Sequence, residues 1–415
     1  MHTGEQQRSF WVPVICGGVI LTIGIGSRQS FGIFQTPIAA DLNVGRELWS
    51  FGNAVSMLLL GLCSPFVGNL ADRFGSARTV AGGGVIYVAG MLIMATATEG
   101  VQLTLGNALT GVGMAAAGFG PIFGVITRQT PVVKRSIALG VATAAGSFGQ
   151  FAVVPLASAL QARFGHWHTT MLILALMSLA VLPLTLGLRE DRGARPGLAR
   201  PQSSREALEE AFGNGSFWLL TVGFFVCGFH VAFVGLHLPA YISDQAIGMT
   251  AFGRTITPLE LGGWAIGLVG LFNIAGSLLW AWLGGRHKRK DMLALLYLLR
   301  SLVFIAFLAL PLSAVSVLAF AAALGFLWLG TVPLTSGLVG YLFGPVYMST
   351  LYGIVFFSHQ LGSFLGGWGA GRLYDVRGNY DAMWWLSIGL GLFAAAIHWP
   401  IRERPVERLR VQPAE

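Results

Sequence analysis

The chain has 415 residues, of which 54% belong to the apolar set AVILMFWYC and only 11% are charged. A soluble domain usually has about 25% charged residues, so this composition excludes a soluble protein and indicates one that lies in a membrane. The net charge of +8 could suggest a nucleic-acid partner, but lysine and arginine kept in cytoplasmic loops give the same total. The cysteines Cys16, Cys63 and Cys227 lie in apolar runs and form neither a disulfide framework nor a metal-binding motif.

Apolar runs of about 20 residues, the length that crosses a bilayer core as a helix, occur repeatedly along the chain. They lie near residues 10–37, 48–70, 78–98, 101–127, 136–162, 168–188, 216–242, 258–284, 291–311, 314–340, 349–371 and 383–400. Many of the 57 glycines fall inside these runs, and small residues let helix backbones pack closely. The sequence therefore predicts an all-α membrane protein with twelve transmembrane helices.

Lysine and arginine are unequally distributed between the segments that join the runs. With the N-terminus inside, 19 of the 26 fall in cytoplasmic segments and 5 on the opposite face, while Arg28 and Arg300 lie within runs. This excess predicts that both termini are cytoplasmic, and it accounts for the positive charge without a nucleic acid. We expect a multi-pass protein of a bacterial inner membrane.

The longest polar stretch, residues 189–216, separates the first six runs from the last six. The expected organisation is an N-terminal six-helix bundle at 1–190, a cytoplasmic linker at 191–215, a C-terminal six-helix bundle at 216–401 and a cytoplasmic tail at 402–415. Ser203 and Glu206 have the spacing of a capping box, which predicts a short surface helix in the linker. We interpret this helix as a solvated spacer; a regulatory role is the alternative.

The two halves of the sequence resemble each other. Residues 26–37 align with residues 228–239 at an offset of 202, with Gly, Phe and Pro identical at three positions. The pairs Leu139-Gly140 and Tyr352-Gly353 align at an offset of 213, as do Gly149 and Gly362. A duplicated six-helix unit is typical of secondary transporters, and the repeat pairs Arg28 with His230 and Gln35 with His237.

Three ionisable residues are predicted near the bilayer centre. At about 1.5 Å per helical residue, Arg28, His230 and His359 all lie near the middle of their runs, while every acidic residue falls at a run end, in a loop or in a tail. Such a residue is costly in lipid and indicates a functional site. An arginine without a protein anion suits a substrate carboxylate. The alternative is a structural arginine bound to carbonyls or to Gln29, Gln35 or Gln360.

Other residues could contribute to the same site. We expect His230 and His359 to bind substrate and carry a proton, although neutral histidines can also pack within a bundle, and His237 lies nearer the outer end of its run. Arg300 is expected to extend to the cytoplasmic surface. Aromatic and hydroxyl residues that could line the cavity, or simply pack in the core, are Phe31, Phe34, Phe119, Trp328, Thr331 and Thr335.

The segment Gly68–Arg78, between the second and third runs, reads GNLADRFGSAR. It resembles the loop signature of the major facilitator superfamily, G-x-L-x-D-R-x-G-x-x-R, with matches at Gly68, Asp72, Arg73, Gly75 and Arg78. The resemblance covers essentially the whole chain and implies two six-helix bundles that rock about a central cavity. In the family this aspartate meets the start of span 11 and steadies the outward-open state. The corresponding second loop has Gly285 in place of the aspartate.

Span 1, and span 11 with Tyr352-Gly353 followed by His359, resemble the monocarboxylate porters and the bacterial oxalate:formate exchangers. The sequence departs from the exchangers at His359, where they have a lysine, and at Ser277, where they have an arginine. Drug:proton antiporters share the Asp72 loop, but Asn107 stands in place of their span 4 arginine and Val154 precedes Pro155 in place of their Gly-Pro pair.

The sequence therefore predicts a secondary active transporter for a small organic anion, with a monocarboxylate as the expected class. Proton symport through His230 or His359 is favoured over carboxylate exchange, and a drug:proton antiporter or a sensor without flux are the other interpretations. The expected partners are the anion, a proton and membrane lipid, with no nucleic acid and no cofactor, and the chain is expected to be a monomer. No nucleophile, metal-ligand or phosphate-loop pattern supports an enzyme.

Overall fold

The computed structural model describes residues 10–131, 134–189, 203–251, 253–344 and 347–409, apart from the side chains of Asp72, Arg73, Arg135, Ser136, Ile137, Ser204 and Ser349. These residues are almost entirely helical, with one antiparallel hairpin formed by β1 (Met249–Ala251) and β2 (Arg254–Ile256). The all-helical expectation is confirmed.

We call the elements before residue 189 the first half and those after residue 214 the second half. The first half contains α1 (Trp11–Gln29), η1 (Ser30–Phe34), α2 (Gln35–Asp41), α3 (Arg46–Phe74), α4 (Ser76–Ala95), α5 (Gly100–Ala117), α6 (Phe119–Gln129), α7 (Arg135–Phe164), α8 (Trp167–Ser178), α9 (Val181–Leu184) and η3 (Thr185–Leu188). The second half contains α11 (Gly215–Asp244), the hairpin, α12 (Pro258–Arg286), α13 (Arg289–Ala309), α14 (Ala314–Phe326), α15 (Thr331–Phe343), α16 (Met348–Arg377), α17 (Asp381–His398) and η4 (Glu407–Leu409).

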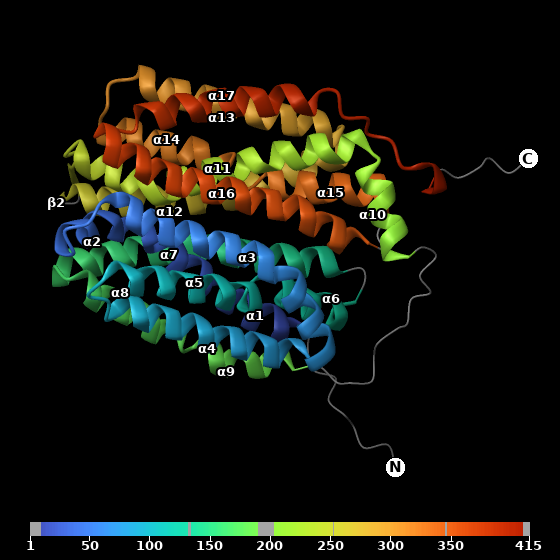
Figure 1. Cartoon of the computed structure of the whole chain (residues 1–415), viewed down its shortest axis with the longest axis horizontal. Coiled ribbons are helices and arrows are strands. Elements are labelled where there is room, and N and C mark those ends of the chain that lie inside the picture. The colour runs from blue at the N-terminus through green and yellow to red at the C-terminus, as the bar shows by residue number, and fades with distance from the viewer. Residues whose placement is uncertain (1–9, 132–133, 190–202, 252, 345–346, 410–415) are drawn as a thin grey trace, which may run out of the picture.

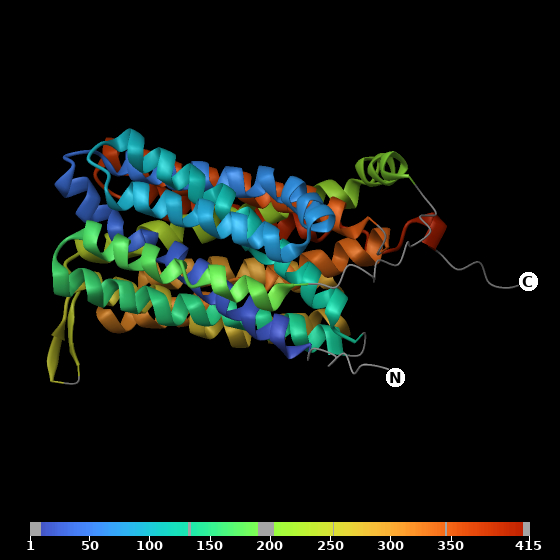
Figure 2. The same cartoon turned by 90° about the horizontal axis from the view of Figure 1, so that it is seen from below.

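The two halves lie side by side as two helical bundles whose helices run roughly along one common axis (Figure 1). Their contact is made mainly by α3 against α16 and by α7 against α12. We call the end with α2 and the β1–β2 hairpin the hairpin end, and the end with α10 (Ser204–Phe212) and η4 the linker end. Figure 2 shows the hairpin projecting from the bundle at the first of these ends.

Eleven helical segments of the described chain are long and apolar enough to cross a membrane. They correspond to eleven of the predicted runs. The remaining run, near residues 349–371, corresponds to α16, a helix of 30 residues that is less apolar because Ser358, His359 and Gln360 lie in its middle. The number twelve and the cytoplasmic location of the termini stay predictions.

Close backbone contacts hold helices together within each half. A Cβ atom added to Gly149 of α7 would lie 2.1 Å from the Thr22 carbonyl oxygen of α1. In the second half, a Cβ atom at Gly362 of α16 would lie 2.0 Å from the Phe225 carbonyl oxygen of α11. Only glycine permits these approaches, so each of these helix pairs is a tightly packed unit.

In the described chain, four predicted spans are interrupted helices, and two of them, at 10–37 and 168–188, divide into α1, η1 and α2 and into α8, α9 and η3. The span at 101–127 divides into α5 and α6 at Gly118, and the span at 314–340 divides into α14 and α15 between Phe326 and Thr331. A break in an apolar environment frees backbone groups that need new partners. At the break between α14 and α15, Arg300 Nη2 donates to the carbonyl oxygens of Leu327 (2.6 Å) and Trp328 (2.7 Å).

This contact corrects the expectation that Arg300 extends to the cytoplasmic surface. Its side chain is 0% exposed, and Nη1 also lies 3.6 Å from Cys227 Sγ. The backbone N–H of Leu329 at the same break donates to Asn273 Oδ1 at 3.0 Å. Arg300 is therefore held in the core because the interrupted helix supplies two acceptors there.

The short helix α10 begins with the predicted capping box. The backbone N–H of Ser203 donates to Glu206 Oε2 at 2.7 Å, and the N–H of Glu206 donates to Ser203 Oγ at 3.2 Å. The bond from the Ser203 backbone N–H, followed by a hydrogen bond from the Ser203 side chain, lowers the pKa of the Glu206 carboxyl group. Ala207 and Ala211 are buried, so α10 packs against the bundle and is not the fully solvated spacer that we expected.

The segment after α17 also packs against the linker end. The N–H of Val406 donates to the Leu342 carbonyl oxygen at 2.9 Å, and Arg408 Nε donates to Glu210 Oε2 of α10 at 2.9 Å. Glu403 accepts hydrogen bonds from the N–H groups of Arg289 and Lys290, both at 3.1 Å, and so caps the start of α13. Residues 402–409 of the predicted tail thus join α10, α13 and α15.

Candidate functional site

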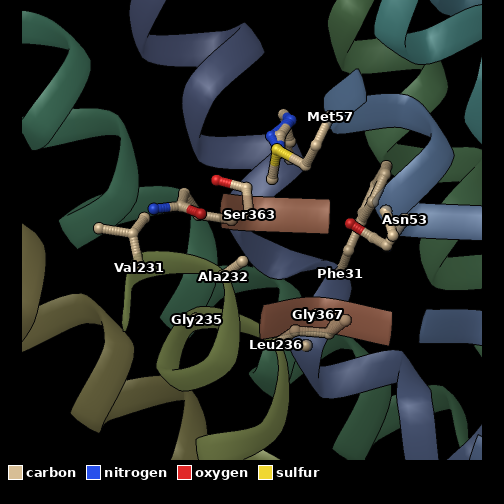
Figure 3. A pocket seen from close by; sticks show the side chains of 13 residues that line it. Phe31, Asn53, Met57, Val231, Ala232, Gly235, Leu236, Ser363 and Gly367 are labelled. Carbon is tan, nitrogen blue, oxygen red and sulfur yellow. The ribbon is translucent and has the colours of Figure 1, made fainter. Parts of the chain in front are cut away.

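A cavity of about 30 Å³ lies between the two halves, near the middle of their helices. Its volume is room for about two water molecules. The first half contributes Arg28 and Gln29 from α1, Phe31 from η1, and Asn53 and Met57 from α3. The second half contributes mainly apolar and small residues of α11 and α16, including Val231, Leu236, Ser363 and Gly367 (Figure 3).

Arg28 is the cation of this cavity. Its Nη2 atom contacts the Met57 sulfur, and no described carboxylate lies within ion-pair distance of it. Within the described chain, no hydrogen bond joins the Arg28 side chain to a backbone carbonyl or to Gln29, Gln35 or Gln360. A structural arginine would need partners of this kind.

A hydrogen-bonded network connects the halves between this cavity and the hairpin end. His237 Nδ1 lies 3.2 Å from Gln35 Nε2 and 3.0 Å from the Tyr380 hydroxyl, and His237 Nε2 lies 2.8 Å from the Gly367 carbonyl oxygen. Gln35 Nε2 also donates to Ser50 Oγ at 2.9 Å. Gln35 and His237 are paired by the sequence repeat, and here they are in direct contact.

Charged contacts between the halves close the hairpin end. Arg46 of α3 donates to both carboxylate oxygens of Asp244 of α11, at 2.7 and 2.5 Å, and its Nη1 donates to the Tyr380 hydroxyl at 2.9 Å. Glu47 accepts hydrogen bonds from Trp368 Nε1 (3.0 Å) and Arg372 Nη1 (2.9 Å) of α16. A bidentate arginine–carboxylate pair is a strong and directional contact.

Asp375 adds a further contact that the sequence analysis missed. Its carboxylate, at the end of α16, accepts hydrogen bonds from the backbone N–H groups of Arg46 (2.9 Å) and Glu47 (2.8 Å) at the start of α3. A signal for it was present: residues 371–378 and 68–75 share the pattern G-x-L-x-D-x-x-G. The end of α16 therefore repeats the first part of the Asp72 loop.

The remaining predicted residues lie elsewhere in the second half or at its periphery. His230 is fully buried, with Nε2 2.8 Å from the Ser387 carbonyl oxygen, and His359 Nδ1 lies 3.3 Å from Gln360 Oε1. Trp328 and Thr331 are fully buried. The cavity thus brings together Arg28, Gln29 and Phe31, while Gln35 and His237 join the network and His230, His359, Gln360, Trp328 and Thr331 line neither.

Phe119 of the first half does not line the cavity either. Its side chain is 38% exposed at the start of α6, with its ring centroid 5.0 Å from that of Phe123.

The loop signature Gly68–Arg78 forms the end of α3 and the turn into α4. Gly75 has a φ of +93°, a conformation that favours glycine and explains its place in the pattern. Arg78 is exposed in the first turn of α4, and a Cβ atom added to Gly68 would meet no described atom within 4 Å. The side chains of Asp72 and Arg73 lie outside the described part of the structure. Across the residues that were described, no cluster of three metal-ligating side chains occurs.

Two packed helical bundles with a cavity at their interface are typical of a membrane transporter, and comparison with known proteins identifies its family. The family model of the Major Facilitator Superfamily matches residues 16–367. The chain belongs to this superfamily, as its loop signature indicated, and it is a transporter and not an enzyme.

Relatives of similar length support this conclusion. An uncharacterized MFS-type transporter of Bacillus subtilis, YcxA, is 26% identical over 407 residues, covering 92% of this chain and 91% of the relative. Monocarboxylate transporter 13 of Bos taurus is 25% identical over 383 residues, covering 90% of this chain and 84% of the relative.

Solved structures show the same fold. A bacterial homologue of the human lysosomal transporter Spinster, in an inward-facing and unoccupied conformation, aligns with a TM-score of 0.75 at 15% identity, over 99% of this chain and all of the other. The nucleoside transporter NupG aligns with a TM-score of 0.76 at 14% identity, over 94% of this chain and 99% of the other.

Proposed function

We propose that the protein is a secondary active transporter that moves a small organic anion, with a monocarboxylate as the expected class, by alternating access. The observation that carries this proposal is the position of Arg28 in the cavity between the halves, where no described carboxylate pairs with it. A guanidinium in a site of low polarity favours an anionic ligand, and its two parallel N–H donors match a carboxylate. Relatives named monocarboxylate transporters support the same class.

The conformation that we propose for this structure is the inward-facing one. If both termini are cytoplasmic, as the charge distribution predicts, the hairpin end faces the outside, and this is the end that Arg46, Asp244 and Asp375 close. The substrate would then bind Arg28 from the outside only after these contacts separate.

For coupling, we favour a proton carried by His359 or His230. His359 lies four residues before Ser363, which lines the cavity, so it is one helical turn along α16 from that site. His230 lies one residue before the cavity residue Val231, but its imidazole is bonded to Ser387. A bound anion would stabilise the charged imidazolium, and its departure would release the proton. Exchange of one anion for another requires no such proton and is the second candidate.

The deciding experiment is uptake by proteoliposomes of a panel of labelled solutes, namely acetate, lactate, pyruvate, oxalate and a cationic dye, with and without an imposed pH gradient. The proposal expects uptake of at least one carboxylate and its competition by other carboxylates. Uptake of the dye alone would identify a drug:proton antiporter. Counterflow of a carboxylate that ignores the pH gradient would identify an exchanger, and the absence of any flux would favour a sensor.

A further inference from the structure

A second polar residue of the cavity, Asn53 of α3, has an unusual environment. Its side chain is 6% exposed, and its amide nitrogen is buried without a hydrogen-bond partner among the described residues. Figure 3 shows Asn53 at the cavity wall, across from Ser363 and next to Phe31. The Ser363 hydroxyl is already used, because it donates to the Gly228 carbonyl oxygen at 3.1 Å.

An amide buried without an acceptor is unfavourable, and most such groups in proteins find a partner. Asn53 would find one in a ligand that enters the cavity. A half-turn of the amide about the Cβ–Cγ bond exchanges its oxygen and nitrogen with little change of shape, and so directs the donor to a ligand. Arg28 of α1 lines the same cavity and likewise has no anionic partner among the described residues.

We propose that Asn53 is a substrate ligand, which donates its amide N–H to one oxygen of the carboxylate while Arg28 binds the other. This inference rests on the proposed function, because it takes an anion as the substrate. Two donors on one side of a small cavity match the two oxygens of a single carboxylate.

The opposite wall suggests which carboxylates fit. Within the described chain, the α11 and α16 residues that line the cavity include no cation and no unpaired donor. The wall there consists of Val231, Ala232, Leu236 and the glycines Gly235 and Gly367, with Ser363 as its polar member. A short apolar tail would pack against this wall. A second carboxylate would be desolvated there without a cation to pair with, which is costly. The site therefore selects small monocarboxylates over dicarboxylates.

The test is equilibrium binding of labelled pyruvate to the purified full-length protein in detergent, with unlabelled acetate and malonate as competitors. For the wild type, acetate should compete and malonate should compete at least tenfold less well. Asn53→Ala should weaken pyruvate binding about tenfold, the loss expected for one hydrogen bond to a charged group. Asn53→Asp should abolish binding near neutral pH, because its carboxylate would pair with Arg28 and repel the ligand.

The matched control is Asn107→Ala, which removes another buried asparagine of the first half. Asn107 is 0% exposed, does not line the cavity, and its amide donates to the Leu103 carbonyl oxygen of its own helix at 3.0 Å. This variant should bind pyruvate within about twofold of the wild type. Asn53→Ser and Asn53→Gln, which keep a donor, should recover part of the affinity, and they provide folded variants if Asn53→Ala does not fold.

The outcomes separate the two proposals. Wild-type protein that binds neither pyruvate nor acetate would overturn the proposed function and this inference with it. Wild-type binding that Arg28→Ala abolishes but every folded Asn53 variant retains would overturn the role of Asn53 alone. Equal competition by acetate and malonate would overturn the preference for monocarboxylates.

Discussion

Arg28 and Arg300 both lie within membrane-spanning segments, but their surroundings give them different tasks. Arg300 is fully buried and bound to the backbone at the break between α14 and α15. Arg28 lines the cavity between the halves, and among the described residues its side-chain hydrogen-bond contact is with the Met57 sulfur. Arg300 completes the fold, and Arg28 retains donors for a ligand.

Replacing Arg28 should affect transport and leave the fold intact. Arg28→Ala should reduce carboxylate uptake at least a hundredfold, because a charged hydrogen-bonded partner of the anion is lost, and Arg28→Lys should retain a little because it keeps the charge without the two-pronged geometry. Uptake by proteoliposomes measures the loss, and gel filtration of the purified variants controls for folding. Normal affinity of Arg28→Ala for all transported anions would contradict this role.

Replacing Arg300 should have the opposite effect. Arg300→Met leaves the Leu327 and Trp328 carbonyl groups without their donor, at a cost of about 1–3 kcal/mol for each buried unpaired group. We expect a melting temperature several degrees lower, with pyruvate affinity of the folded fraction unchanged. Arg377→Met, which alters an exposed arginine at the end of α16, is the control and should melt like the wild type. A variant of Arg300 that melts normally but no longer binds anions would assign Arg300 to the substrate site.

At the scale of elements, the apolar runs predicted the helical segments well but not the interruptions in them. The run at 101–127 is apolar on both sides of Gly118, so hydropathy carries no signal for the division into α5 and α6. The burial of α10 was missed because alanines form its packed face, and alanine is common in exposed helices too. Asn53 has an amide nitrogen without a described partner, and Asp375 has partners in the other half. Both were missed because these surroundings depend on which helices meet between the halves.

The last turn of α3 carries a prediction about the rate of transport. Asp72→Asn should slow carboxylate flux about tenfold, because the family resemblance implies that this carboxylate attracts a helix N-terminus, and the substitution removes its charge. Binding should change little, as measured by quenching of intrinsic tryptophan fluorescence, to which Trp49 beside Phe31 contributes. A large loss of affinity, with the inward/outward equilibrium unaltered, would show that Asp72 belongs to the binding site.

For the whole molecule, coupling to protons is the property that the histidines should determine. In the double variant His230→Gln, His359→Gln, pH-driven accumulation of carboxylate should disappear while counterflow of labelled against unlabelled substrate persists. His398→Gln is a control, since this buried histidine bonds to Ala394 in α17 and lies outside the cavity. Full pH-driven accumulation in the double variant would remove these histidines from the mechanism.

The Asp375 contact means that one half of the molecule completes a helix of the other. The N-cap of α3 is Gly45, which has no side chain to bond the first free N–H groups, and Asp375 of the second half accepts from two of them. Every opening of the hairpin end must therefore leave the first turn of α3 uncapped. The start of α13 provides a contrast, since Glu403 caps it from within the same half.

Hydrogen–deuterium exchange can use this difference to follow the transport cycle without a probe attached to the protein. Amide exchange at Arg46 and Glu47 should accelerate whenever the hairpin end opens, and Asp375→Ala should accelerate it at least fivefold, because the amides lose their acceptor. Exchange at Arg289 and Lys290 should stay constant throughout. Amide exchange in the first turn of α3 would then report each opening of the hairpin end, because it accelerates only when the two halves separate.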